Sequence, residues 1–225
     1  MSYASAAAAV PGSAGPYGGA MRTLRTTALV TAPPLLLAVA GLTHPRHLTA
    51  ATADHWAELH IVLLPAFPLL VLGLLLPLWG RPGRDVEGAL TVLAWAGCFC
   101  YAAYYTGLDA VAGIGAGTAA GTGVRGVVGR LFATGNDLGL TGVYALAVAT
   151  LATGLVLLRR HGARVLPGVV VVLGACWSFA ESHIFWPQGV LTMLGFAVGF
   201  GLLVVASRTG GVRRTRATAG SLTNS

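Results

Sequence analysis

The sequence contains very little charge and no lysine at all. Only 9% of its 225 residues are charged, whereas a soluble domain usually carries about 25%. Apolar residues make up 55% of the chain, and they form repeated runs long enough to cross a bilayer, which takes about 20 residues. The scarcity of charge excludes an ordinary soluble domain and predicts an integral membrane protein that contacts the lipid bilayer.

All fourteen basic residues are arginines, and the chain has a formal net charge of +7. Proteins that bind nucleic acids gather such charge on one face, often with aromatic side chains between the cations. Here the arginines are scattered between apolar runs. The charge therefore predicts an orientation in a membrane and no nucleic-acid partner.

Cysteine is also scarce, and the common metal and haem motifs are missing from the sequence. Cys98, Cys100 and Cys176 fall inside apolar runs, where a free thiol usually packs as a small apolar group. Their odd number argues against a disulfide framework, and the sequence contains no CxxC, CxxCH or HExxH. The glycine-rich stretch 113–126 lacks the GK[ST] ending of a phosphate-binding loop, and we expect it to be a loop or a re-entrant segment.

The apolar runs define an all-α fold, a polytopic transmembrane helical bundle of about six spans. The prolines at 33–34, and those at 65 and 68, are expected to bend the first two spans. We expect residues 1–24 to be a disordered Ala/Gly/Ser/Pro segment, 25–206 to be the six-span domain and 207–225 to be a basic tail. The predicted spans are 27–42, 57–79, 89–109, 138–158, 167–182 and 189–206.

The N-terminal region leaves two alternatives open. Met21 is an alternative start of translation. Arg22 and Arg25, followed by an apolar run and the small residues Ala38 and Ala40, also match a cleavable signal peptide. Cleavage would leave five spans and an external N-terminus, without changing the sidedness of the rest.

The arginines predict which side of the bundle faces the cytoplasm, because basic loops tend to stay inside. With a cytoplasmic N-terminus, eleven arginines fall on the inner side and three on the outer side, and the bias alternates along the loops. The outer three are Arg46, Arg125 and Arg130. We therefore expect a multi-pass protein of the cell membrane with both termini in the cytoplasm.

The titratable groups gather on the predicted outer side. Residues 43–60, THPRHLTAATADHWAELH, hold four of the six histidines. Ionisable groups at bilayer depth are costly and usually serve function, so the outer half of the bundle is the predicted site. The outer set is His44, His47, Asp54, His55, Glu58, His60, Asp109, Asn136, Asp137, Glu181 and His183.

Part of this set has an ordinary structural explanation. Asp54 suits the first turn of the second helix, where the helix dipole favours an acid. Asn136 and Asp137 suit the start of the fourth helix as a cap and a first-turn acid. His47 and His55 suit a solvated surface.

Other members are expected to point into the bundle. His60 lies about one turn inside the second span, and Trp56, four residues earlier, shares its face. Two further stripes with a spacing of four residues are predicted to face inward, Tyr101–Tyr105–Asp109 on the third helix and Trp177–Glu181 on the fifth.

These residue types favour a site that binds a metal or a haem. Imidazoles and carboxylates from separate helices can bind a divalent metal such as zinc, iron or manganese, which can activate water against a lipid ester, amide or phosphate. Two histidines at similar depth can instead ligate a haem b. The predicted metal ligands are His44, His60 and His183, and the predicted catalytic residues are His60, Asp109 and Glu181.

Three other functions stay open at this level. A buried carboxyl could donate a proton, with histidine as the base, in a cofactor-free isomerase or cyclase that acts on an isoprenoid-like lipophilic substrate. The proline-bent spans could line the path of a transporter. The chain could also be a non-catalytic membrane subunit.

Four stretches of the sequence resemble uncharacterised small integral membrane proteins of actinobacteria. The resemblance extends over most of residues 40–206, and it implies no activity, cofactor or catalytic residue. The stretches are GLTHPRHL, WAELHIVLLPAFPLL, YYTGLDAVAGIGAG and ESHIFWPQGVLTMLGFAVGFGLL.

The predicted topology can be tested with reporter fusions in whole cells. An alkaline phosphatase reporter fused after residue 50 should be active, because the enzyme folds only outside the cytoplasm, and a fusion after residue 162 should be inactive. The reverse pattern would place the histidine-rich segment in the cytosol and contradict the assigned sidedness.

Overall fold

The computed structural model describes residues 16–80 and 82–208, and this part of the chain is helical without strands. Six of its helical runs are long and apolar enough to cross a membrane, which confirms the predicted all-α bundle. The elements are α1 (Pro16–Gly41), α2 (Ala53–Leu63), η1 (Pro68–Val71), α3 (Leu72–Leu75), η2 (Leu76–Leu78), α4 (Val86–Leu108), η3 (Asp109–Gly115), α5 (Ala116–Gly121), η4 (Arg125–Val127), α6 (Val128–His161), η5 (Ala163–Val165), α7 (Leu166–Glu181) and α8 (Gln188–Arg208).

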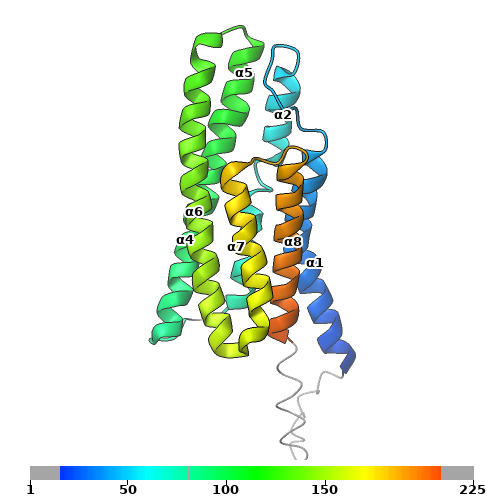
Figure 1. Cartoon of the computed structure of the whole chain (residues 1–225), viewed down its shortest axis with the longest axis vertical. Coiled ribbons are helices and arrows are strands. Elements are labelled where there is room, and N and C mark those ends of the chain that lie inside the picture. Colours follow the sequence, from blue (N-terminus) through cyan, green and yellow to red (C-terminus); the bar gives the residue numbers. More distant parts are fainter. Residues whose placement is uncertain (1–15, 81, 209–225) are drawn as a thin grey trace, which may run out of the picture.

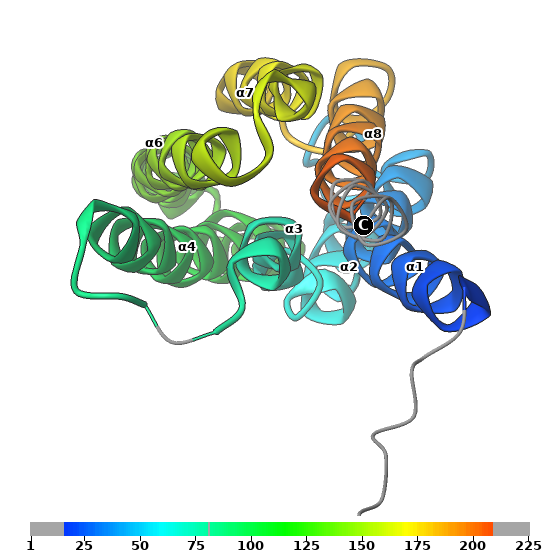
Figure 2. The ribbon, with the colours of Figure 1, turned by 90° about the horizontal axis from the view of Figure 1, so that it is seen from below.

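The helices form a ring of neighbours around a packed centre (Figures 1 and 2). α4 and α6 make a long antiparallel pair, α7 lies between α6 and α8, and α1 packs against α8. The described chain begins at Pro16 and ends at Arg208 at the same end of the bundle (Figure 1), as an even number of spans requires. That this end faces the cytoplasm stays a prediction.

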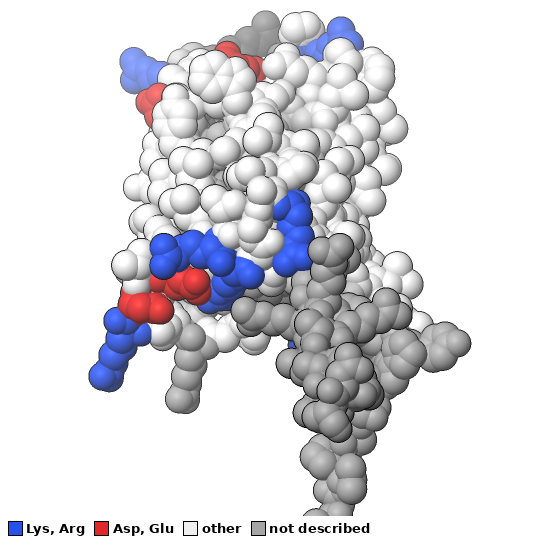
Figure 3. All heavy atoms as spheres, turned by 60° about the horizontal axis from the view of Figure 1, so that its bottom comes forward, with Lys and Arg blue, Asp and Glu red and all other residues white. Residues whose placement is uncertain are grey.

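The surface agrees with a protein that is surrounded by lipid. Charged side chains lie near the two ends of the bundle, and the surface between them is uncharged on the face that Figure 3 shows. Large apolar side chains on the spans, among them Phe99, Val170 and Leu151, are exposed. Hydrocarbon can cover such side chains, whereas in water they would form an unfavourable patch.

A series of phenyl rings packs three of the spans together. The ring of Phe67, in the turn after α2, lies 6.4 Å from that of Phe179 on α7. Phe179 contacts Phe196 on α8 at 5.7 Å, and Phe196 contacts Phe200 at 5.6 Å. All four rings are buried, and the packing fixes the end of α7 beside the break in the second span.

That break is the predicted one. α2 ends at Leu63, a turn follows that contains Pro65, and η1 begins at Pro68. A proline removes a backbone donor and clashes with the preceding turn of a regular helix, so the second span continues as short 3₁₀ and α segments. In the first span, by contrast, α1 continues through Pro33 and Pro34.

The expectation of a loop at 113–126 is wrong for most of that stretch. η3 is a π-helical segment that joins α4 to α5, so the third helical run extends without interruption from residue 86 to residue 121. Glycine has a low helix propensity, but here it allows close packing against α2. A Cβ on Gly117 would lie about 3.0 Å from the Cβ and backbone nitrogen of Ala57.

Two other predicted boundaries are also wrong. α6 begins at Val128 rather than at 138, so Asn136 and Asp137 lie within a helix and do not cap it. α1 begins at Pro16, within the segment expected to be disordered, because proline suits a first helical turn and Ala20, Met21 and Leu24 favour a helix. Residues 1–15 and 209–225 of the predicted terminal segments lie outside the described part of the chain.

The helices differ in length, and this difference shapes the site. The third and fourth runs have 36 and 34 residues, or about 50 Å at 1.5 Å per residue, whereas a hydrocarbon core is about 30 Å thick. The fifth run, 163–181, has 19 residues and about matches that thickness. In Figure 1, α5, α6 and α2 therefore continue beyond the ends of α7 and α8.

Candidate metal centre

Three histidines from distant parts of the sequence meet at the level where α7 ends. His44 lies in the loop after α1, His60 lies in the last turn of α2, and His183 lies in the loop between α7 and α8. One ring nitrogen from each lies within 4.8 Å of the others. The ring centroids are 5.1 Å apart for His44–His60, 5.3 Å for His44–His183 and 5.5 Å for His60–His183. The predicted metal ligands are thus brought together.

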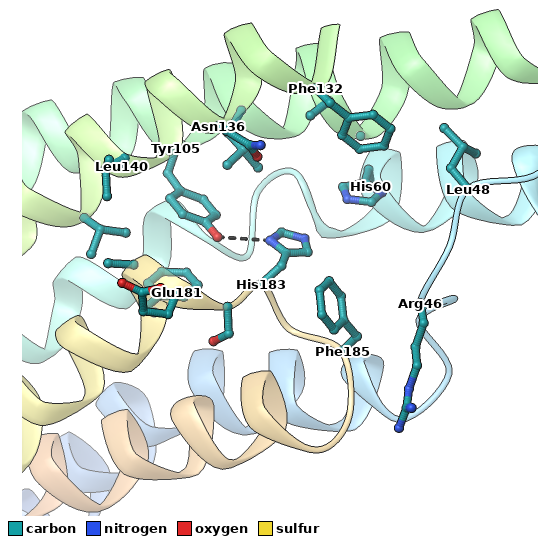
Figure 4. A pocket seen from close by; sticks show the side chains of 18 of the residues that line it. Arg46, Leu48, His60, Tyr105, Phe132, Asn136, Leu140, Glu181, His183 and Phe185 are labelled. Atoms are coloured by element: carbon teal, nitrogen blue, oxygen red, sulfur yellow. Dashed lines mark hydrogen bonds between the residues drawn. The ribbon is translucent and has the colours of Figure 1, made fainter. Parts of the chain in front are cut away.

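Each of the three rings uses Nδ1 for a hydrogen bond. Nδ1 of His44 is 2.7 Å from the carbonyl oxygen of Pro45, and Nδ1 of His60 is 2.7 Å from that of Trp56. Because a carbonyl only accepts, both Nδ1 atoms carry the proton and both Nε2 atoms present a lone pair. Nδ1 of His183 pairs with the hydroxyl of Tyr105 at 3.1 Å (Figure 4).

The opposite nitrogens of the rings have no hydrogen-bond partner among the described residues. Nε2 of His44 and Nε2 of His183 are buried and form no hydrogen bond with any described residue. His60, which is 3% exposed, bonds only through Nδ1 within the same part of the chain. Buried polar nitrogens are normally satisfied, so this cluster is a candidate site for a group from outside the chain.

The surroundings keep the two loop histidines uncharged. Burial, with smaller contributions from His60 and His55, lowers the pKa of His44 to about 4, although its hydrogen bond to Pro45 acts in the opposite direction. Burial, together with His44 and His60, holds the pKa of His183 well below its usual value of 6.5. Metal ions bind only the neutral imidazole, and both rings are in that form at neutral pH.

The π-helical segment η3 supports His60 from behind. The indole Nε1 of Trp56 donates to the carbonyl of Ala112 in η3 at 3.2 Å. Trp56 also accepts the hydrogen bond from His60, so it links His60 to η3. Gly113 packs directly on the His60 ring, and an added Cβ would overlap the ring carbons. Single π-helical turns often occur at functional sites. The glycine-rich stretch thus forms one wall of the site.

The loop that carries His183 is held by close backbone packing. A Cβ on Gly41, at the end of α1, would overlap the carbonyl of Ile184, and the Ile184 side chain is completely buried. α7 ends at Glu181 and the backbone of Ser182 is extended, which turns His183 back toward the bundle. The loop therefore reaches the site because α1 ends in a residue without a side chain.

Aromatic rings surround the cluster. Trp56 and Phe185 approach His44 with ring centroids 4.8 and 5.7 Å away, and Phe67 lies 5.5 Å from His183. Phe132 contacts Trp56 at 5.8 Å. These rings form the apolar part of the surroundings of the three histidines.

A cavity of about 620 Å³ adjoins the cluster, and His60 and His183 form part of its wall. Figure 4 shows Phe132, Asn136 and Leu140 in succession along α6 on one side of it. The other lining residues are Arg46, His47, Leu48, Trp56, Tyr105, Leu108, Ala112, Gly113, Gly139, Val143, Phe179, Ala180, Glu181, Ser182 and Phe185.

The predicted stripe on the third helix does face the interior. Tyr101, Tyr105 and Asp109 are at most 2% exposed. The hydroxyl of Tyr101 donates to the carbonyl of Phe67 at 3.3 Å, and Tyr105 reaches His183. Asp109 is fully buried, both of its carboxylate oxygens are without partners among the described residues, and it is not part of the cavity wall found there.

The expectation that Glu181 and Trp177 point into the bundle is wrong. Trp177 is 77% exposed and Glu181 is also exposed. α7 turns Val172, Cys176 and Phe179 inward, so residues at 177 and 181 fall on the outer side of the helix. Glu181 lies at the edge of the cavity rather than beside the histidines (Figure 4).

The other titratable groups of the outer set are exposed, and for Asp54, His47 and His55 this agrees with the structural explanation given above. Asp54 lies in the first turn of α2, and His47, His55 and Glu58 are exposed. No sequence pattern predicted that the carbonyls of Pro45 and Trp56 accept hydrogen bonds from His44 and His60. None predicted that Gly113 packs on the His60 ring. Only the repeat of Tyr101, Tyr105 and Asp109 pointed to the partner of His183.

Comparisons with protein-family models, with curated protein sequences and with solved structures found no match to this chain. The site is therefore interpreted from its own geometry.

The lowered pKa of His44 predicts how stability depends on pH without metal. The unfolded chain protonates this histidine near pH 6.5 and the folded protein only near pH 4, so unfolding takes up a proton between these values. Stability is fully retained above pH 6.5 and is lost as the pH falls toward 4, by up to about 3 kcal/mol from this residue.

Thermal unfolding of the detergent-solubilised, metal-free protein at pH 7.5 and pH 5.0 measures this effect. The fall in Tm should be smaller in His44→Gln than in the wild type, because glutamine does not titrate. His55→Gln, a change at an exposed histidine, should keep the wild-type response. Equal responses in all three proteins would show that His44 is not desolvated.

Proposed function

We propose that this membrane protein binds one divalent transition-metal ion through Nε2 of His44, His60 and His183, near its extracytoplasmic surface. The observation that supports this is the convergence of three ring nitrogens within 4.8 Å, each on a ring whose Nδ1 is already engaged. A hydrogen bond from the second ring nitrogen is the usual support of a metal-bound histidine, because it fixes the tautomer and the ring orientation.

The ligand set favours a small ion of borderline softness. Imidazoles suit zinc, copper(II), iron, cobalt and nickel, whereas magnesium and calcium prefer oxygen ligands. Zinc binds imidazole nitrogen at about 2.0–2.1 Å, so tetrahedral ligands lie about 3.4 Å apart. The three nitrogens, now within 4.8 Å of one another, would need to close by up to about 1.4 Å. The rings of His60 and His183, which are stacked at 9°, would also need to turn toward the ion.

A haem b fits this arrangement less well. Its two axial ligands approach from opposite faces of a flat macrocycle, whereas the three imidazoles here lie at similar separations of 5.1–5.5 Å around one point. The aromatic rings of Trp56 and Phe185 pack close to His44, which favours an ion over a large planar cofactor.

Three protein ligands leave a fourth position for water or a substrate, as in catalytic zinc sites, whereas structural zinc sites usually have four protein ligands. His60 and His183 line the cavity, so this position would open into it. We infer that a metal bound by these three histidines would supply Lewis acidity to the cavity, the chemistry that activates water against an ester, amide or phosphate. The protein would then be a metal-dependent membrane enzyme.

The cofactor-free alternative receives less support from the geometry. It needs a carboxyl beside the substrate, but Asp109 is not among the described residues that line the cavity, and Glu181 lies at its exposed edge. Asp109 is better placed to influence Tyr105 and the packing around it.

Metal binding is tested on protein purified without a polyhistidine tag. Stoichiometric zinc or cobalt(II) should bind, and bound cobalt should give the visible absorption of a tetrahedral site. His60→Ala and His183→Ala should each lower the affinity at least 100-fold, because two imidazoles cannot complete the site.

His55→Ala and His161→Ala are matched controls, since these histidines lie outside the cluster, and both should bind metal as the wild type does. Binding that survives in the His60 and His183 variants, or fails in the wild type, would refute the proposed site.

A second prediction concerns Tyr105. When Nε2 of His183 binds the metal, Nδ1 carries the proton and donates it to the Tyr105 hydroxyl, which orients the ring. Loss of such a partner typically weakens metal binding 10- to 100-fold. Tyr105→Phe should show this loss by cobalt titration, whereas Tyr104→Phe, on the exposed side of α4, should not. Equal affinities would remove Tyr105 from the site.

A further inference from the structure

The cavity beside the three histidines changes character along its length. Its α6 wall runs from Phe132 to Val143, eleven residues or about 16 Å along the helix axis. Toward the protruding end, the wall includes the polar residues Arg46 and His47, and Asn136 follows one turn below Phe132. Toward the middle of the bundle it is apolar, with Val143 and Phe179 both buried.

Two exposed residues of the lining place one opening of this cavity between α6 and the end of α7. Leu140 on α6 and Glu181 on α7 both line it, and both are exposed at the surface. α7 ends at Glu181, whereas the N-terminal end of α6, which begins at Val128, extends further along the bundle. α7 therefore does not cover this N-terminal part of α6. Figure 4 shows Leu140 and Glu181 on the same side of His183.

The depth of the opening follows from the length of the fifth span. The run 163–181 spans about 28 Å, close to the thickness of the hydrocarbon core. Glu181 therefore lies near one boundary of the hydrocarbon, and Val143 and Phe179 lie below it. A molecule at this opening has its polar part at the interface and its apolar part in the bilayer.

The size of the cavity limits the ligand. Its volume of about 620 Å³ falls within the range of about 300–1,000 Å³ for sites that hold one small molecule. One acyl or isoprenoid chain with a compact polar end fits this description.

We propose that the cavity takes a single-chain amphiphile from the adjacent leaflet, which enters between Leu140 and Glu181 with its oxygen-bearing polar end at the three histidines and its chain along Val143 and Phe179. This inference rests on the proposed metal site and adds its ligand class. Leu140 sets the width of the opening and is a specificity-determining residue.

Alkyl hydroxamates test the proposal, because the hydroxamate group binds the open position of a metal and the chain can be lengthened. The cobalt-loaded protein in detergent is titrated with acetohydroxamate and with octanohydroxamate, and the change in the cobalt spectrum gives each Kd. The wild type should bind octanohydroxamate at least 10-fold more tightly.

Leu140→Trp should narrow the opening, reduce this preference to less than 3-fold and leave the Kd of acetohydroxamate unchanged. Leu151→Trp is the matched control, since Leu151 is an exposed leucine of the same helix outside the cavity wall. In this variant the ligand partitions into detergent to the same extent, and the full preference for octanohydroxamate over acetohydroxamate should remain. If Leu140→Trp loses the cobalt spectrum, Ala180→Leu, a smaller obstruction in the same wall, replaces it.

The possible outcomes separate the two proposals. The wild type, Leu140→Trp and Leu151→Trp could all show the same chain-length preference. That result would reflect detergent partition alone and would overturn the ligand assignment, while the metal site would stand. A wild-type protein that gives no cobalt spectrum would overturn the metal site, and with it the ligand assignment.

Discussion

The site depends on three imidazole nitrogens that are close together, buried and uncharged. Two protonated rings at centroid separations of 5.1–5.5 Å would repel one another in a poorly solvated place, so protonation of the cluster destabilises the fold. The carbonyls of Pro45 and Trp56 and the hydroxyl of Tyr105 bond to Nδ1, and burial lowers the pKa of His44 and His183. The same conditions prepare histidines to bind a metal ion.

The unequal helix lengths give this cluster its setting. α2, α5 and α6 continue beyond the ends of α7 and α8 at one end of the bundle, and the shorter α7 and α8 are joined there by a loop. His183 comes from this loop, and the cavity opens where α7 stops. In the proposed arrangement, a metal held there would meet water from one side and bilayer components from the other, which links the proposed chemistry to the proposed amphiphilic ligand.

Much of the fold and part of the site could be predicted. Apolar runs give six spans because a bilayer accepts few other structures, and the four-residue repeat of Tyr101, Tyr105 and Asp109 correctly predicted an inward stripe. The same rule failed for Trp177 and Glu181, because spacing shows that two residues share a face but not which face is buried. Helix propensity failed at 113–121, where packing of Gly113 and Gly117 against α2 stabilises helical structure.

The sequence by itself determined the class of the protein, the number of its spans and the segment 43–60 that is rich in histidine, since these follow from hydropathy and composition. The sequence also suggested His44, His60 and His183 as ligands and His47 and His55 as surface residues, but only the tertiary structure brought one ring nitrogen of each of the first three within 4.8 Å of the others. That convergence depends on the direction in which two loops leave their helices and on close approaches at Gly41 and Gly113. Such contacts join residues far apart in the chain, so no local pattern encodes them.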